Sequence, residues 1–134
     1  MSAPEATPIV TGVDFVSVPT RDLERANAFY GETLGLPRSA YHPEGNVAEF
    51  ETGTVTLSVV DPERMGIGSF TANANHVALH VEDVAAARAE LEGRGVVFAG
   101  DSFDTGVCHM AIFADPNGNA LMLHHRYAPR VPEG

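Results

Sequence analysis

Apolar and polar residues alternate along two stretches of this chain, residues 13–19 and residues 75–81. Alternation with a period of two predicts β-strands, and the first stretch carries so few charges that both of its faces are expected to be covered. An aspartate follows each stretch, Asp22 and Asp83, and apolar residues then recur at the spacing of an amphipathic helix. Aspartate accepts hydrogen bonds from the free N–H groups of a first helical turn. The pattern therefore predicts a strand that runs directly into a helix, at two places in the chain.

The two strand–helix pairs repeat one plan at a fixed distance along the chain. Aligning Asp22 with Asp83 gives an offset of 61 residues (83 − 22), which lays the apolar positions of the first strand on those of the second. One pair breaks the match, because Phe15 falls on His76. Self-similarity of this kind predicts two copies of one structural unit, each about half of the chain.

Shorter apolar runs and turn signals follow each predicted helix. Turn sequences occur at Thr52-Gly53 and at Asp115-Pro116-Asn117-Gly118. In the second of these, proline presets φ and Asn-Gly tolerates positive φ. Residues 37–45 and 100–106 are rich in glycine and polar residues, so we expect loops there. The further strands expected are 46–51 and 54–60 in the first copy, and 96–98, 107–114 and 119–125 in the second. Each copy should thus hold a strand, a helix and two or three more strands.

A length of 134 residues fits one domain with a sizeable core. We expect a flexible tail at 1–10, a single domain at 11–127 and a C-terminal tail at 128–134. Within the domain, the first module spans 11–60, a turn-rich linker 61–74 and the second module 75–127.

The charge balance argues against several kinds of partner. Eighteen acidic residues against eight basic ones give a formal charge of −10, and the acids are spread along the chain. Affinity for nucleic acid and for anionic lipid comes from Lys and Arg, so neither a nucleic-acid nor a membrane partner is expected. No apolar run approaches the roughly 18 residues of a membrane span, and the first residues lack an export signal, which favours a cytoplasmic protein. The single cysteine, Cys108, excludes an intrachain disulfide and is expected to be a small buried residue in a strand.

Three features together resemble the vicinal oxygen chelate superfamily, which includes glyoxalase I, bleomycin-resistance proteins, fosfomycin-resistance enzymes and extradiol dioxygenases. They are the duplicated βαβββ pattern, the segment 22–36 with Asp-Leu-Glu-Arg-Ala, Phe-Tyr and Leu-Gly-Leu, and the segment 113–119, Phe-Ala-Asp-Pro-Asn-Gly-Asn. The resemblance covers about residues 11–127. It implies an α+β fold of two tandem βαβββ modules, whose curved mixed sheets enclose a pocket with the helices outside. It also implies a homodimer, with pockets formed either across the dimer or within one chain.

Metal-dependent members of this superfamily hold a divalent ion with residues of the first and last strands of the modules. The resemblance places the first-strand positions at Phe15 and His76, and counting four residues past each hairpin glycine gives Leu57 and Met122 for the last strands. Of these, His76 alone is a good ligand for Mg²⁺, Mn²⁺, Fe²⁺ or Zn²⁺. We therefore predict that the protein uses no metal and no other cofactor.

A displaced metal site is the alternative. Alternation along the strands places His76 and His80 on one side of their strand and His124 on one side of another, so the three imidazoles could meet across the sheet and bind Zn, Mn or Fe. His76 and His124 are also the candidates for general acid–base catalysis. Such a site would make the protein a glyoxalase I-like lyase, a thiol transferase or a ring-cleaving dioxygenase. Glu49, an acid inside an expected strand, is expected to face outward.

The expected pocket is mostly apolar and aromatic, with a few polar contacts, as in many small-molecule sites. We predict a metal-free binding protein of the bleomycin-resistance type that sequesters an apolar or aromatic compound, and its acidic surface would also suit a cation. A non-catalytic ligand-sensing or scaffolding subunit is a third hypothesis. The residues expected to contact the ligand are Phe15, Ser17, Leu57, Val59, His76, His80, Met110, Ile112, Met122 and His124.

Overall fold

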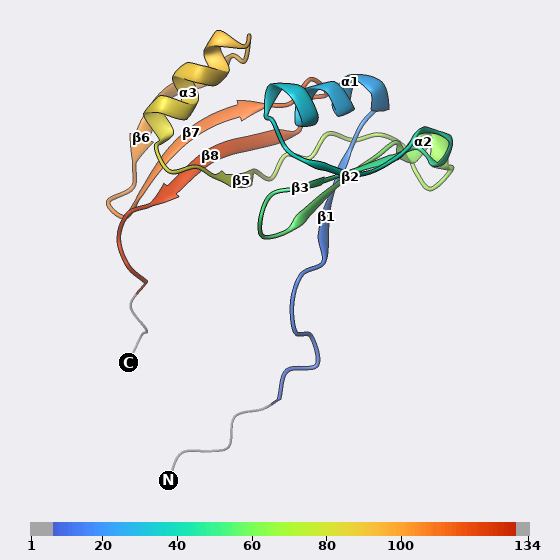
Figure 1. Ribbon diagram of the computed structural model, residues 1–134, viewed down its shortest axis with the longest axis horizontal. Helices are drawn as coiled ribbons and strands as arrows, with labels where there is room; N and C mark the ends of the chain where they lie inside the picture. Colours follow the sequence, from blue (N-terminus) through green and yellow to red (C-terminus); the bar gives the residue numbers. More distant parts are fainter. Residues whose placement is uncertain (1–6, 131–134) are drawn as a thin grey trace.

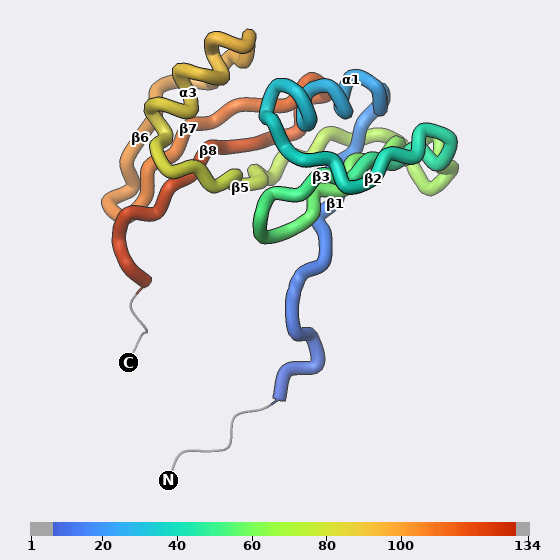
Figure 2. Tube along the Cα trace, in the orientation of Figure 1, coloured from blue at the N-terminus to red at the C-terminus, as the bar shows by residue number. Residues whose placement is uncertain are grey.

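The computed structural model describes residues 7–130 and folds them into two four-stranded sheets (Figure 1; Figure 2). The expected tails at 1–10 and 128–134 lie partly outside these residues. The first unit holds β1 (Phe15–Pro19), β2 (Arg38–His42), β3 (Val47–Glu51) and β4 (Thr56–Val60), and the second holds β5 (Val77–His80), β6 (Phe98–Asp104), β7 (Cys108–Ala114) and β8 (Ala120–Arg126).

Both sheets have the same topology. Their strand orders are β1-β4-β3-β2 and β5-β8-β7-β6, so the first strand of each unit lies beside the last and the remaining strands follow as antiparallel neighbours. The first and last strands run parallel, with Val16 opposite Leu57 in one unit and Val77 opposite Leu121 in the other. The predicted α+β fold of two βαβββ modules is confirmed. The two sheets are mixed and do not close on each other.

The helices begin where the sequence predicts. Asp22 precedes α1 (Leu23–Ala28), and its carboxylate accepts a hydrogen bond from the backbone N–H of Arg25 at 3.1 Å. Asp83 caps α3 (Val84–Gly93) in the same way through the N–H of Ala86, at 3.0 Å. After α1 the chain widens into a π-helical turn (Phe29–Thr33). A short helix, α2 (Pro62–Met65), lies in the expected linker.

Two segments expected to be loops form strands. Residues 38–42 are β2, with a short 3-10 turn at Pro43–Gly45, and residues 100–104 lie within β6. Both strands are edges of their sheets, with one neighbour each. Most of their side chains are exposed, so they lack the apolar alternation that marks a half-buried strand.

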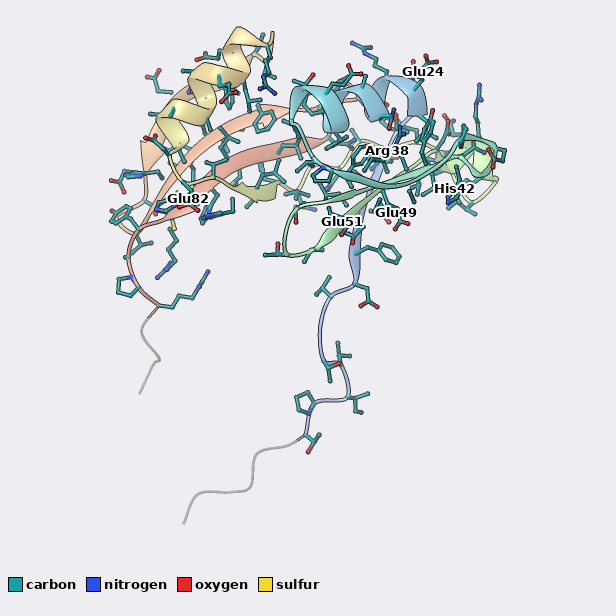
Figure 3. All side chains as sticks on the ribbon, in the orientation of Figure 1. Glu24, Arg38, His42, Glu49, Glu51 and Glu82 are labelled. Carbon is teal, nitrogen blue, oxygen red and sulfur yellow. The ribbon has the colours of Figure 1, made fainter. Side chains whose placement is uncertain are left out.

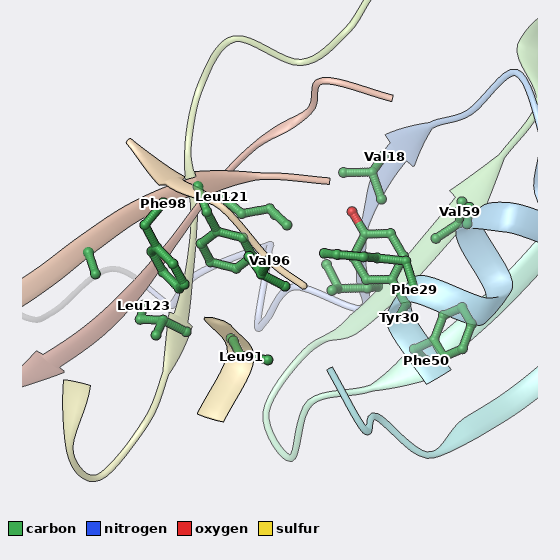
Figure 4. Close-up of a cluster of buried hydrophobic side chains, with 14 of the residues drawn as sticks. Val18, Phe29, Tyr30, Phe50, Val59, Leu91, Val96, Phe98, Leu121 and Leu123 are labelled. Atoms are coloured by element: carbon green, nitrogen blue, oxygen red, sulfur yellow. The ribbon is translucent and has the colours of Figure 1, made fainter. Parts of the chain in front are cut away.

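The buried core lies between each sheet and its helix (Figure 4). Side chains alternate across a strand, so every second residue faces the helix. Under α1 these include Val18 and Phe50, both fully buried, and under α3 they include Leu121 and Leu123. Within residues 7–130, α1 and α3 lie on the same side of the two sheets in Figure 1 and leave the opposite face of each sheet uncovered.

A buried hydrogen-bond network in the Asp115–Asn119 turn joins the two units. The Asp115 carboxylate accepts hydrogen bonds from the Tyr30 hydroxyl at 2.6 Å and from the Asn119 amide at 2.7 Å. The Asn119 amide also donates to the carbonyl of Pro19, at 2.7 Å. Burial first, and then the Asp115 charge and hydrogen bond, raise the pKa of Tyr30 well above its usual value. The turn therefore fixes one unit against the other.

Among residues 7–130, no helix has both the length and the apolar character needed to cross a membrane.

Candidate functional site

Each sheet presents a face that its helix does not cover. In the first unit, Phe15 lies opposite Thr56 and Ser17 lies opposite Ser58, so these four side chains share the face away from α1. Glu49 pairs with Ser58 and belongs to the same face. Figure 3 shows Glu49 and Glu51 below the sheet, on the side away from α1. We call this surface the first open face.

The strand register corrects one predicted site position. Because Val16 matches Val77 in the repeat, its partner Leu57 matches Leu121, and Ser58, not Leu57, matches Met122. Counting from the hairpin glycines failed because each glycine lies at a different distance from the strand that follows it: residues 54–55 separate Gly53 from β4, whereas Asn119 alone separates Gly118 from β8.

Leu57 and Val59 consequently lie on the helix-covered face, where they are 2% and 1% exposed. The expectation that they share a surface with Phe15 is wrong, since neighbouring residues of a strand point to opposite faces.

The four positions at which the resemblance implies metal ligands are therefore Phe15, Ser58, His76 and Met122. An aromatic ring, a neutral hydroxyl and a thioether are poor ligands for the divalent ions that such sites hold. His76 supplies one imidazole, and a stable site needs three or four good donors. These residues do not fit a catalytic divalent ion.

Carboxylates and hydroxyls dominate the rest of the first open face. Glu51 accepts hydrogen bonds from the Ser39 hydroxyl at 2.6 Å and the Thr56 hydroxyl at 2.7 Å. These two hydrogen bonds, the one from Ser39 more strongly, hold the pKa of Glu51 below its usual value. Glu49 is half-buried beside Ser58, which is 5% exposed. This cluster could not be predicted from the sequence, because it depends on the register of three strands.

The second open face has a different composition. Met110 lies opposite His124, and Ile112 lies opposite Met122, which also neighbours Ala78 of β5. Met110, Ile112, Met122 and His124 are all half-buried. This surface, the second open face, is thus apolar and polarisable, with an imidazole at one end. His76 is exposed and directly precedes β5.

The histidines group differently from the predicted set of His76, His80 and His124. His80 and His124 are register neighbours. However, the donor atoms that lie close together are those of His80, Glu82 and His125. Within residues 7–130, His76 and His124 belong to no such group of three metal-binding side chains.

A cavity of about 740 Å³ lies between the two units, on the side of the helices. Its walls are mainly aliphatic, with Val16 and Leu57 from the first unit and Leu79 and Leu123 from the second. Of the predicted ligand contacts, Leu57 and His80 line it. A cavity of this size and composition can hold a drug-sized molecule.

These features define a member of a known class. The chain belongs to the Glyoxalase/Bleomycin resistance protein/Dioxygenase superfamily, whose family model matches residues 12–123. The resemblance deduced from the duplicated units is confirmed.

Individual relatives differ in what they are described to do. TnmS3, an antibiotic-binding protein from Streptomyces sp. CB03234, is 28% identical with a TM-score of 0.74, covering 90% of this chain and 99% of its own. A glyoxalase/bleomycin resistance protein from the same organism is 30% identical with a TM-score of 0.67, covering 86% of this chain and 100% of its own. A lactoylglutathione lyase from Agrobacterium tumefaciens shares the fold at 19% identity, with a TM-score of 0.73 and coverage of 88% and 94%.

Proposed function

We propose that this protein binds an aromatic, positively charged small molecule without chemical change and without a metal ion. The observation that carries the proposal is the set of side chains at the four metal-ligand positions of the superfamily. Phe15, Ser58, His76 and Met122 offer one imidazole where an ion would need several donors. The same side chains are well suited to hold an organic compound by stacking and apolar contact.

Phe15 and the carboxylates support an aromatic cation as the ligand. Phe15 is 57% exposed at the start of β1, so its ring is free to stack on a planar molecule. Glu49 and Glu51 lie on the same open face and favour positive charge near that ring. Met110 and Met122 on the second open face can adapt to an irregular apolar surface.

Similarity to an antibiotic-binding protein supports binding over catalysis. TnmS3 is described as an antibiotic-binding protein, and its structure aligns with nearly all of this chain at 28% identity. The lactoylglutathione lyase is less similar in sequence, at 19%. We therefore propose sequestration of a compound of the antibiotic type as the function.

We further propose that two copies form a homodimer that covers the open faces. β1 and β5 are edge strands, each with one hydrogen-bonded neighbour. Residues 7–14, which precede β1, extend away from the sheets as an arm (Figure 2). Ile9 and Val13 of this arm are 100% and 65% exposed. Exposed strand edges with apolar side chains are prone to pair with another chain. A partner copy would bury both the arm and the open faces.

Binding of two dyes tests the ligand chemistry. We expect the aromatic cation ethidium to bind more tightly than the aromatic anion 8-anilinonaphthalene-1-sulfonate, measured by fluorescence titration. Glu49→Gln should weaken ethidium binding about fivefold, the equivalent of losing about 1 kcal/mol of surface charge attraction. Glu24→Gln is the matched control, because Glu24 lies on α1, away from the open face (Figure 3), and it should change nothing.

Phe15→Ala should weaken the binding of both dyes, since stacking does not depend on the sign of the charge. Preference for the anion, or equal effects of the Glu49 and Glu24 substitutions, would contradict a carboxylate-lined site. Loss of dye binding after treatment with EDTA would contradict the metal-free proposal.

Size-exclusion chromatography with light scattering would test the proposed dimer, because it measures the molar mass of the protein in solution.

A metal-dependent lyase, thiol transferase or dioxygenase is the second candidate. The observation in its favour is the group formed by His80, Glu82 and His125. The effect of metal removal separates the two candidates, because the enzyme requires Zn, Mn or Fe for its activity, whereas the binding protein should hold ethidium equally well after chelation.

A further inference from the structure

We propose that His80, Glu82 and His125 form a binding site for a divalent transition-metal ion, separate from the four metal positions of the superfamily. One ligand atom from each residue lies within 4.8 Å of the other two. An ion with bonds of about 2.1 Å holds its donor atoms roughly 3 to 3.5 Å apart, so modest side-chain rotations would close the site. His80 and Glu82 are exposed and free to make them.

The backbone brings the three residues together at the end of two parallel strands. His80 is the last residue of β5 and lies beside His124 of β8. The N–H of Val81 donates to the carbonyl of His124 at 3.0 Å, which keeps the chain alongside β8 one residue further. The His80 and His125 rings then lie with their centroids 5.7 Å apart.

His125 is held in the form that a metal requires. Its Nδ1 lies 3.1 Å from the carbonyl oxygen of Val81. A carbonyl only accepts hydrogen bonds, so Nδ1 must carry the proton, and the neutral ring then offers the Nε2 lone pair. A hydrogen bond from the second ring nitrogen to a backbone carbonyl is the usual way in which proteins fix a metal-binding histidine. This bond is an observation independent of the proximity of the three side chains.

His80 and Glu82 already interact. The His80 Nε2 lies 3.1 Å from the Glu82 Oε1, where it can only donate, because a carboxylate accepts. A divalent ion would replace that proton and bind both atoms. The protein's formal charge of −10 also favours cations near its surface.

Two imidazoles and a carboxylate suit Zn²⁺, Co²⁺, Ni²⁺ or Fe²⁺ and leave coordination positions open. The ion would stand between two cavities. His80 lines the 740 Å³ cavity between the units, and Glu82 and His125 line a second cavity of about 540 Å³. The open positions could therefore accept a donor atom of a molecule held in either cavity.

Calorimetric titration of Zn²⁺ into the chelator-treated full chain tests the site. We expect one ion per chain, and we expect His80→Ala, Glu82→Gln and His125→Ala each to weaken binding by more than the 10–100-fold that loss of an outer-shell partner typically costs. His42→Ala is the control, because His42 is an exposed histidine on β2, far from Glu82 in Figure 3. The visible absorption of bound Co²⁺ should be lost in the same three variants.

Three results would overturn the proposal. They are no Zn²⁺ binding, unchanged affinity in His80→Ala and His125→Ala, or equal weakening by His42→Ala. Loss of binding in His76→Ala alone would place the ion at the superfamily position instead. Folding of each variant is checked by circular dichroism without metal. Ethidium binding is also measured in His125→Ala. This variant should lose the metal ion and still bind the dye, so failure of the metal site and failure of the proposed ligand-binding function can be told apart.

Discussion

Tyr30→Phe should destabilise the protein through the network that joins its two units. The Tyr30 hydroxyl is buried and donates to the Asp115 carboxylate at 2.6 Å. Hydrogen bonds to charged groups contribute about 1.5–3 kcal/mol. The same carboxylate oxygen keeps the Asn119 amide as a donor at 2.7 Å, so it is not left without a partner. We therefore expect a loss near the lower limit, about 1.5–2 kcal/mol in the free energy of unfolding.

Urea denaturation followed by circular dichroism measures this loss, and the midpoint should fall with little change in slope. The effect should also depend on pH. The pKa of Tyr30 is raised in the folded protein, so its stabilising contribution is complete below the ordinary tyrosine pKa of about 10 and declines as the pH rises above that value. The difference between wild type and Tyr30→Phe should accordingly shrink above pH 10.

Tyr127→Phe is the matched control. Its hydroxyl also donates to an aspartate, Asp104, at 2.9 Å, but the pair is exposed and solvent competes for both partners. We expect little change in the urea midpoint. Equal destabilisation by the Tyr30 and Tyr127 substitutions would refute the argument from burial.

Three further predictions concern local structure. Gly118→Ala should lower the free energy of unfolding by about 1–2 kcal/mol in urea denaturation, because Gly118 has φ of 86°, whereas Gly12→Ala, with no atom within 4 Å of the added carbon, should be neutral. Asp83→Ala should cost about 1 kcal/mol in the same assay by removing the cap of α3; an unchanged midpoint would show that the cap contributes nothing. Cys108, 5% exposed, should react with a thiol reagent in urea and not in the native protein, and rapid native reaction would contradict its burial.

The duplicated fold was predictable because its signals are local. Asp22 and Asp83 cap helices through bonds to residues three positions away, and alternation marks the strands that cover a core. β2 and most of β6, residues 100–104, escaped prediction for the opposite reason. They are exposed edge strands, whose pairing depends on a neighbour and leaves no pattern in their own residues.

The candidate site was less predictable because it depends on register and on chain ends. The first hairpin has one more residue between its glycine and the next strand than the second hairpin has, so Met122 matches Ser58 and not Leu57. Alternation placed His80 with His124, but it holds only inside a strand, and His80 is the last residue of β5. Its ring approaches His125 instead.

The two copies of the unit have kept their fold and diverged in the chemistry of their open faces. At the repeated positions, Ser58 stands in the first unit where Met122 stands in the second, and Phe15 where His76 stands. Carboxylates of β3 accompany the first pair, and aliphatic side chains of β7 accompany the second. A ligand that touches both faces would meet negative charge at one side and an apolar, polarisable surface at the other. That asymmetry favours a molecule with a cationic group and an aromatic body over a small symmetric metabolite, and it follows from which residues the common fold presents, because the backbone of the two units is alike.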